Sequence, residues 1–329
     1  MRKFFPAANT PQGFFSRFDS VYDEKDDNKV VFIKGGSGTG KSTLMKKILK
    51  DAQTLGFETE AFFCSSDPNS LDGVRIPDKR AVIVDATSPH TQDPLMPGIS
   101  GKIYNIADFW NEELLIPHKD EIMHLISLKK ENFNNCYRYL AAAQTLYPNK
   151  SSNLYDIKNI CRKFSFPYKD SIGKTRKLFA SGITPDGNVN FLEDILVGRI
   201  IGIKESPNTS DILKQLNFSA NISGYDTELF FCPMFPNEKA EHLVIKELSL
   251  SFTTKNEFHS FDRTYETIHF ETPSHNNEHI KELLNLAIKS LSDAKTHHKK
   301  IEQIYISAMD FEKMDKTYQS ISSYLLGWI

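Results

Sequence analysis

The sequence predicts an α/β protein of two tandem repeats, each with a parallel sheet and an appended helical arm. Short runs rich in Val, Ile and Phe alternate with helical patterns, which is typical of strand–helix–strand units. The same segments also occur twice in the same order. "KFFPAANTPQG" (3–13) returns as "KLFASGITPDG" (177–187), and "EAFFCSSDPNS" (60–70) returns as "ELFFCPMFPNE" (228–238). We expect the two copies to pack as an internal pseudo-dimer.

The length and composition fit two soluble domains. The chain has 329 residues, of which 40% are hydrophobic and 25% charged, and its net charge is −2. This charge gives no reason to expect nucleic acid or an anionic membrane as a partner. The four cysteines show no C-x-x-C spacing, and no apolar run approaches the roughly 18 residues of a membrane span. We therefore expect reduced thiols and a cytoplasmic protein, divided near residue 172 into domains 1–172 and 173–329.

Each repeat is expected to hold four strands, a helix after the first strand, and an irregular crossover between the second and third strands. The expected strands are 30–34, 59–64, 80–85 and 102–106 in the first repeat, and 199–204, 228–232, 248–253 and 266–271 in the second. The helices that follow the first strands are 41–55 and 210–217, and the helical arms are 111–145 and 276–315. Residues 3–18 and their copy are interpreted as a strand and a turn that flank each sheet.

A glycine-rich loop follows the first strand of the first repeat. Residues 35–42, Gly-Gly-Ser-Gly-Thr-Gly-Lys-Ser, fit G-x-x-x-x-G-K-[ST] at every position. Glycines let backbone N–H groups wrap a chain of phosphates, and the N-terminus of the next helix faces the same anion. Lys41 is expected to reach the β- and γ-phosphates, Ser42 to bind Mg²⁺ and Thr43 to contact a phosphate oxygen. The predicted nucleotide-binding residues are Gly35, Gly36, Ser37, Gly38, Thr39, Gly40, Lys41, Ser42 and Thr43.

A second metal ligand is expected from Asp85, which ends the apolar strand "AVIVD" (81–85). A loop of this kind needs a carboxylate on the metal side. An aspartate at a strand end is also a common turn former. Ala86 follows it, so the catalytic glutamate that often stands there in ATPases is missing, and any base that activates water comes from another segment.

Candidates for acid–base chemistry lie in the segments that follow the second and third strands. Loops at the carboxyl ends of strands line the ligand crevice of an α/β sheet. Asp67 and Asp72 could orient a water or an acceptor hydroxyl, and His90 could act as an acid or base or contact phosphate. The Asp-Pro-Asn sequence at Asp67 is equally good turn chemistry, and His90 has a counterpart, His259, in the other repeat. The predicted catalytic residues are Lys41, Asp67 and His90.

The second repeat keeps the position of the loop but not its chemistry. "KESPNT" (204–209) contains no glycine, and Thr209 stands opposite Lys41. Glu205 adds a negative charge beside the phosphate position, and Pro207 removes a backbone donor. The third strand of this repeat has no aspartate. We therefore predict one Mg-nucleotide site per chain, in the first repeat.

One further cluster, "THHKK" (296–300), invites a metal or phosphate interpretation. Adjacent histidines on a helix point about 100° apart and do not bind one ion together. A solvated helix face is the favoured interpretation.

These motifs resemble those of the P-loop NTPase superfamily. More narrowly, the chain is similar to an uncharacterised bacterial family of tandem P-loop ATPase-like or nucleotide-kinase-like proteins. That family pairs a "GxxGTGKS" loop with "CSSDPxSLDG" and "VDxTxPH" stretches, here at 35–42, 64–73 and 84–90. The resemblance covers nearly the whole length and implies two P-loop-type repeats. Family members often keep a recognisable loop in the second repeat, and this chain does not.

Two functions remain open at this point. The first is ATP hydrolysis or phosphoryl transfer to an unknown acceptor, with Lys41 and Mg²⁺ neutralising the charge on the transferred group. The second is a nucleotide-gated switch, in which ATP moves the helical arms and a protein partner responds to that motion. A scaffold with a vestigial site is a third interpretation, and the intact loop argues against it.

Overall fold

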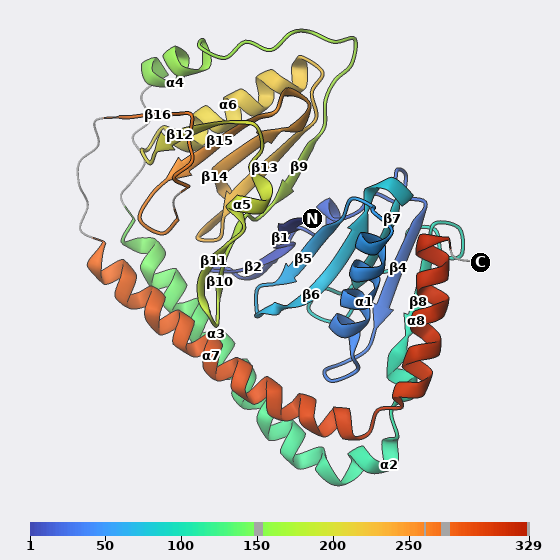
Figure 1. Cartoon of the computed structure of the whole chain (residues 1–329). Coiled ribbons are helices and arrows are strands. Elements are labelled where there is room, and N and C mark those ends of the chain that lie inside the picture. The colour runs from blue at the N-terminus through green and yellow to red at the C-terminus, as the bar shows by residue number, and fades with distance from the viewer. Residues whose placement is uncertain (148–153, 260, 271–276, 328–329) are drawn as a thin grey trace.

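The computed structural model describes residues 1–147, 154–259, 261–270 and 277–327, and it contains two six-stranded sheets with helices around them (Figure 1). The predicted α/β class is therefore confirmed. The expected strand 266–271 and arm 276–315 each have one terminal residue, 271 and 276, outside the described residues. Among the residues described, no helix combines the length and the apolar character needed to cross a membrane.

The first sheet has the strand order β1-β5-β6-β7-β4-β8. Its strands are β1 (Arg2–Phe4), β4 (Lys29–Lys34), β5 (Glu60–Cys64), β6 (Asp67–Ile76), β7 (Ala81–Asp85) and β8 (Gly101–Asn105). Helix α1 (Lys41–Thr54) packs on this sheet because Leu44 and Ile48 lie one helical turn apart and join the same core as Val31 and Ile83. The four predicted strands are present, each within one residue of its expected bounds.

The second sheet repeats this arrangement with the strand order β9-β13-β14-β15-β12-β16. Its strands are β9 (Thr175–Leu178), β12 (Arg199–Lys204), β13 (Thr227–Cys232), β14 (Phe235–Ile245), β15 (Leu250–Lys255) and β16 (Glu266–Ile268). Helix α6 (Thr209–Ile222) packs on it, as α1 packs on the first sheet. Each strand of the first sheet thus has a counterpart at the same place in the second.

The prediction of wholly parallel sheets is wrong, because each sheet contains a strand in place of the expected crossover. β6 runs antiparallel to β5 and β7, and β14 runs antiparallel to β13 and β15. After Cys64 the chain reverses within two residues, and Leu71 and Val74 of β6 are buried in the core. The turn-forming residues at the start of β6 obscured this strand in the sequence. Both sheets are therefore mixed.

A short hairpin follows the edge strand β1 or β9 of each sheet, where the repeated aromatic segment predicted only a strand and a turn. The hairpins are β2 (Ala7–Thr10) with β3 (Gly13–Ser16), and β10 (Ser181–Thr184) with β11 (Gly187–Asn190). Short helical turns complete the fold: η1 (Phe18–Ser20), η2 (Pro77–Lys79), η3 (Ile106–Phe109), η4 (Ile116–His118), α5 (Leu192–Ile195) and η5 (Lys246–Leu248).

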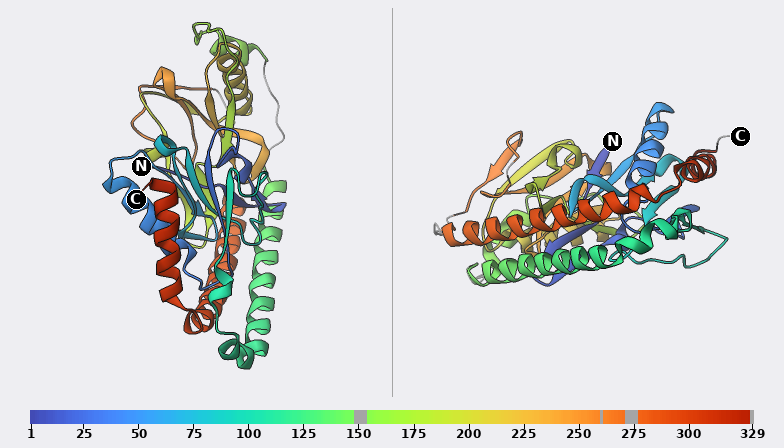
Figure 2. Two further views of the ribbon diagram at one scale, coloured as in Figure 1. Left: turned by 90° about the vertical axis from the view of Figure 1, so that its right-hand side faces the viewer. Right: turned by 90° about the horizontal axis from the view of Figure 1, so that it is seen from below.

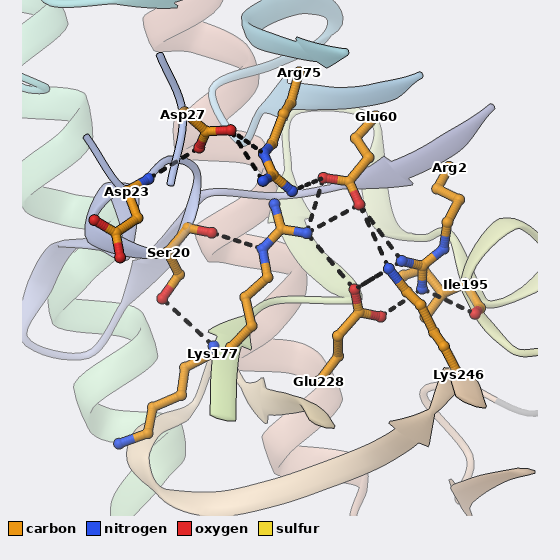
Figure 3. Close-up of polar contacts among 11 residues, drawn as sticks. Arg2, Ser20, Asp23, Asp27, Glu60, Arg75, Lys177, Ile195, Glu228 and Lys246 are labelled. Carbon is orange, nitrogen blue, oxygen red and sulfur yellow. Dashed lines mark hydrogen bonds and ion pairs between the residues drawn. The ribbon is translucent and has the colours of Figure 1, made fainter. Parts of the chain in front are cut away.

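The two sheets meet where their edge strands β1 and β9 end (Figure 1). Beside this junction, a charged network around the buried carboxylates of Glu60 and Glu228 includes Arg2, Arg75 and Lys246 (Figure 3). Arg2 donates to both carboxylate oxygens of Glu228, at 2.7 and 2.6 Å. Burial of a carboxylate is costly without such partners. The junction therefore depends on the charges of both halves.

The helical arms lie side by side and run in opposite directions (Figures 1 and 2). The first arm consists of α2 (Glu112–Leu115) and α3 (Lys119–Thr145), and the second of α7 (Glu278–Ser307) and α8 (Phe311–Leu326). Asp310 separates α7 from α8, because its side chain caps α8 by accepting from the N–H groups of Glu312 and Lys313, both at 3.1 Å. The expected arms are thus present, and the second bends at this cap.

Each sheet is completed by a helix from the other half of the sequence. Ile321 and Leu325 of α8 belong to the core of the first sheet. Ile160 of α4 (Leu154–Cys161) belongs to the core of the second sheet, with Leu213 of α6. The division of the chain near residue 172 stays a prediction, and these helices cross it in both directions.

Candidate functional site

The glycine-rich loop connects β4, which ends at Lys34, to α1, which begins at Lys41. Gly38 and Gly40 have φ values of 76° and 84°, a backbone region that side chains disfavour. Gly40 is the N-cap residue of α1 and has no side chain to accept from the first-turn N–H groups. A helix start of this kind is suited to an anion.

The side chain of Lys41 bends back over this loop. Its Nζ donates to the carbonyl oxygens of Gly35 and Gly36, the latter at 2.9 Å, and lies 3.7 Å from Asp85 Oδ2. Thr39 Oγ1 also donates to Gly36 O, at 2.9 Å. β4 and β7 are parallel neighbours, with Ile33 opposite Asp85, so the loop and Asp85 share one edge of the sheet. The two predicted motifs converge at the Lys41 ammonium.

Thr87 joins the two motifs, and its role was not predicted. Its N–H donates to Asp85 Oδ1 at 2.8 Å, and its Oγ1 donates to Gly35 O at 2.8 Å. Gly35 N in turn donates to Thr87 Oγ1 at 3.1 Å. The threonine within the "VDxTxPH" stretch was the available signal. It fixes the position of Asp85 against the glycine-rich loop.

The two predicted residues Asp72 and His90 lie close to each other and to Cys64. Cys64, Asp72 and His90 have side-chain ligand atoms within 4.8 Å of one another. Asp72 Oδ2 lies 3.6 Å from His90 Nε2. Burial is the main reason that the pKa of Asp72 is raised to about 6; His90 and Lys41 oppose this rise, and the charge of Asp85 adds to it. Asp72 therefore lies within the electrostatic field of the Lys41–Asp85 pair.

Asp67 does not join this group. It lies at the start of β6, and its Oδ1 forms an ion pair with Lys295 of α7 at 2.9 Å. Burial raises the pKa of Asp67, but the hydrogen bond and charge of Lys295 outweigh this, so the net shift is downward. The catalytic role predicted for Asp67 stays a prediction. The observed contact ties the first sheet to the second arm.

The C-terminal turns of helix α7 contact the glycine-rich loop. A Cβ placed on Gly38 would stand 2.8 Å from Glu302 O and 3.0 Å from Tyr305 Cβ. A Cβ on Gly36 would stand 2.9 Å from the Trp110 ring, which packs on Tyr305 with ring centres 4.8 Å apart. Glycine is therefore required for close packing as well as for backbone freedom. Sequence reasoning missed this contact because α7 begins about 240 residues after the loop (278 − 38).

The expected solvated face at 296–300 is confirmed for Thr296, Lys299 and Lys300, which are exposed, whereas His298 is half-buried. Burial, together with Lys129 and Lys41, lowers the pKa of His298 to about 4. Its Nε2 lies 3.6 Å from Glu302 Oε1, and burial raises the pKa of Glu302. These side chains face the first repeat. No local pattern in the sequence distinguishes them from the exposed lysines that follow.

The corresponding loop of the second repeat is filled by its own residues. Lys239 Nζ bonds Glu205 and lies 3.5 Å from Glu241 Oε1. Thr209, at the position of Lys41, accepts from Ser206 N at 3.0 Å. The hydroxyl at the next position is used alike in both repeats: Ser210 accepts from Ala240 N, and Ser42 accepts from Leu71 N, each at 3.0 Å.

One family comparison covers the glycine-rich loop. A family model described as nephrocystin 3, N-terminal, matches residues 12–75. The match spans β4, the loop, α1, β5 and nearly all of β6, and this is less than half of the chain. No curated protein and no solved structure gives a significant match. The chain is thus similar to that N-terminal region over one segment.

Proposed function

We propose that the chain binds a nucleoside triphosphate with Mg²⁺, ATP being favoured, at one site in the first repeat. It uses the nucleotide for hydrolysis or for phosphoryl transfer to an acceptor. The observation that carries this proposal is the 3.7 Å separation of Lys41 Nζ and Asp85 Oδ2 beside a G-x-x-x-x-G-K-[ST] loop. A P-loop enzyme needs a cation for the phosphates and a carboxylate on the metal side. The like strand orders of the two sheets support two P-loop-type repeats, the second degenerate.

The residues present fit Mg²⁺, because all the donors are oxygens. Ser42 Oγ accepts from Leu71 N, and a hydroxyl oxygen has a second lone pair for a metal. Asp85 accepts from Thr87 N through Oδ1, which orients the carboxylate. Mg²⁺ is usually held by one or two protein oxygens with phosphate and water. Ser42 and Asp85 would hold the ion, which neutralises charge on the transferred phosphoryl group when bound.

Asp72 and His90 are better placed than Asp67 to move a proton. Asp72 has a pKa of about 6, near the working pH of a general base, and it responds to the charges of Lys41 and Asp85. His90 Nε2 lies 3.6 Å from Asp72 Oδ2, which is too far for a hydrogen bond, but its charge lowers the pKa of that carboxyl. Asp67 is held in its ion pair with Lys295. We assign proton transfer to Asp72, with His90 as its positioning residue.

Calorimetric titration with ATP, GTP, CTP and UTP in the presence of Mg²⁺ tests the proposal. We expect one equivalent of nucleotide per chain for the wild type and none for Lys41→Ala. Thr209→Ala is the matched control, because Thr209 occupies the position of Lys41 in the second repeat. It should bind one equivalent as the wild type does. Two equivalents, or binding that survives in Lys41→Ala, would contradict the proposed site.

A nucleotide-gated switch is the second candidate, and the contact of α7 with Gly38 favours it. A Cβ placed on Gly38 would stand 2.8 Å from Glu302 O and 3.1 Å from Ile306 N, so a ligand that moves the loop acts directly on the arm. Phosphate release separates the two functions. Turnover that depends on Asp72 supports the enzyme, whereas binding without turnover, accompanied by changed hydrogen exchange in α7, supports the switch.

A further inference from the structure

Three side chains of the second repeat gather in its interior, away from the proposed nucleotide site. Glu241 and His242 are consecutive residues of β14, at a register shift opposite β13, and His259 follows β15. Their ligand atoms lie within 4.8 Å of one another. All three residues are buried, with exposures of 2%, 1% and 8%. Buried polar groups are normally satisfied by hydrogen bonds.

Two imidazole nitrogens in this cluster have no such partner. His242 Nε2 and His259 Nε2 are buried without a hydrogen bond. The other nitrogen of His242, Nδ1, bonds Thr253 Oγ1 at 2.8 Å, and this contact fixes the ring. A metal-bound histidine characteristically uses its second nitrogen in this way. Each histidine of the cluster thus has a nitrogen without a hydrogen bond, and Glu241 adds a carboxylate.

The geometry of the rings suits a tetrahedral ion. The ring centres of His242 and His259 are 4.9 Å apart, with an angle of 61° between their planes. Two imidazoles that bind one Zn²⁺ at about 2.0–2.1 Å, at a tetrahedral angle, have ring centres about 5 Å apart. Glu241 supplies the third ligand through Oε2, which lies 3.9 Å from His259 Nε2. Its other oxygen, Oε1, faces Lys239.

A cavity of about 50 Å³ adjoins the cluster. Glu241 and His259 line it, together with Cys232, Lys239 and Leu284 of α7. One water needs roughly 10–15 Å³ of space on this scale, so the cavity has room for a water bound to an ion at the cluster. Lys239 brings a positive charge, which its contact with Glu205 offsets. The open side of the cluster therefore lies toward space that a ligand can fill.

We infer that Glu241, His242 and His259 bind one divalent transition-metal ion of the Zn²⁺ class, with a fourth position open to the cavity. Two imidazoles and one carboxylate select Zn²⁺, Co²⁺ or Ni²⁺ over Mg²⁺ and Ca²⁺, which prefer oxygen ligands. The corresponding cluster of the first repeat lacks one of the two histidines. This cluster of Cys64, Asp72 and His90 has Gly73, opposite Phe62, where the second repeat has His242 opposite Phe230.

Co²⁺ is the probe for the first experiment, because tetrahedral Co²⁺ has a strong visible absorption band. The full chain is used without a polyhistidine tag, treated with chelator and titrated in the absence of nucleotide. We expect one equivalent per chain, displaced by one equivalent of Zn²⁺. Glu241→Gln, His242→Gln and His259→Ala should each weaken binding at least tenfold. His90→Ala, which removes the corresponding histidine of the first repeat, should leave the band and affinity unchanged.

Thr253→Val tests the site without altering a ligand. Loss of the Nδ1 contact frees the His242 ring, and we expect Co²⁺ affinity to fall about 10–100-fold. This variant also serves if a ligand variant does not fold, which circular dichroism will establish. Absence of the band in the wild type overturns the inference. So does a band that survives His259→Ala in folded protein, or one that His90→Ala abolishes.

Discussion

Phe5 and Phe179 exchange both of their backbone hydrogen bonds, at 3.0 and 3.2 Å, and so link the edges of the two sheets. These residues hold the same place in the repeated segments at the start of each half. A reciprocal contact between equivalent residues is the signature of a two-fold interface between identical subunits. Here both partners belong to one chain. Arg2, three residues before Phe5 in the chain, belongs to the charged network with Glu60 and Glu228 (Figure 3).

The first prediction concerns the charge of Glu228 at this junction. Glu228→Gln should lower the free energy of unfolding by about 3 kcal/mol, because Arg2 and Lys246 lose a buried anionic partner. Glu193→Gln, at an exposed ion pair with Arg263, should change it by less than about 1 kcal/mol. Denaturant unfolding at pH 7 measures both. Equal effects of the two variants would contradict the structural role of the charged network.

The same network predicts acid sensitivity. Burial raises the pKa of Glu228, but Arg2, Lys246 and Arg176 outweigh it and lower the pKa from 4.5 to about 2. A depressed carboxyl pKa contributes stability above the unfolded value and loses it as pH falls toward the folded value. The wild type should therefore lose its advantage over Glu228→Gln between about pH 4.5 and 2. Unfolding curves across this window give the measurement.

The contribution of Asp72 to stability should fall as pH rises, which is the opposite of the contribution of Glu228. Its pKa rises from 3.8 to about 6, chiefly through burial, so folding favours the protonated carboxyl. That contribution is complete below about pH 4 and declines as pH rises through 6, by roughly 3 kcal/mol in total. Asp72→Asn cannot ionise and should lack the decline. Asp67→Asn is the control, since the pKa of Asp67 is lowered and its effect appears only below about pH 4.

A methyl group at Gly38 should separate α7 from the glycine-rich loop. Gly38→Ala must accept both a φ of 76° and a Cβ that stands 2.8 Å from Glu302 O. Gly98→Ala carries a similar φ of 79° with nothing within 4 Å of the new Cβ. Gly98→Ala should cost about 1 kcal/mol, and Gly38→Ala about 1–3 kcal/mol more. Comparing the thermal unfolding of the two variants separates the free-energy cost of the close contact from that of the backbone strain.

The exchange of helices predicts where local unfolding appears. Ile321→Ala in α8 should destabilise the chain by about 2–5 kcal/mol and increase hydrogen exchange in α1, from the opposite half of the sequence. Ile160→Ala in α4 should increase exchange in α6 instead. Exchange mass spectrometry of the two variants should therefore give complementary patterns. The reverse assignment of α1 and α6 would contradict the observed packing.

Local sequence signals were sufficient for one part of this architecture. The strands that end at Lys34 and Asp85 are short apolar runs. The loop between Lys34 and Lys41 matches the pattern G-x-x-x-x-G-K-[ST], which predicts a loop whose backbone wraps phosphate. The repeat also required no structure, because Thr-Pro-x-Gly and Phe-Phe-Cys recur in order. These signals reside in neighbouring residues.

The remainder depends on contacts between distant segments. β6 and β14 begin with turn-forming residues, and their antiparallel pairing follows from the two-residue reversal after Cys64 and Cys232. The contact of Gly38 with Glu302 could not be predicted without the position of the whole second arm. His242 gains its significance only when β15 brings Thr253 and His259 beside it. The hydrophobic periodicity of the sequence does not specify such contacts between distant residues.

The packing of α8 on the first sheet also has a consequence for synthesis of the protein. The N-terminal sheet cannot cover the apolar surface beside α1 until the ribosome has passed residue 326. Nascent chains therefore carry an unfinished first half throughout translation of the second. We expect that half to become resistant to proteolysis only once Ile321 and Leu325 have docked.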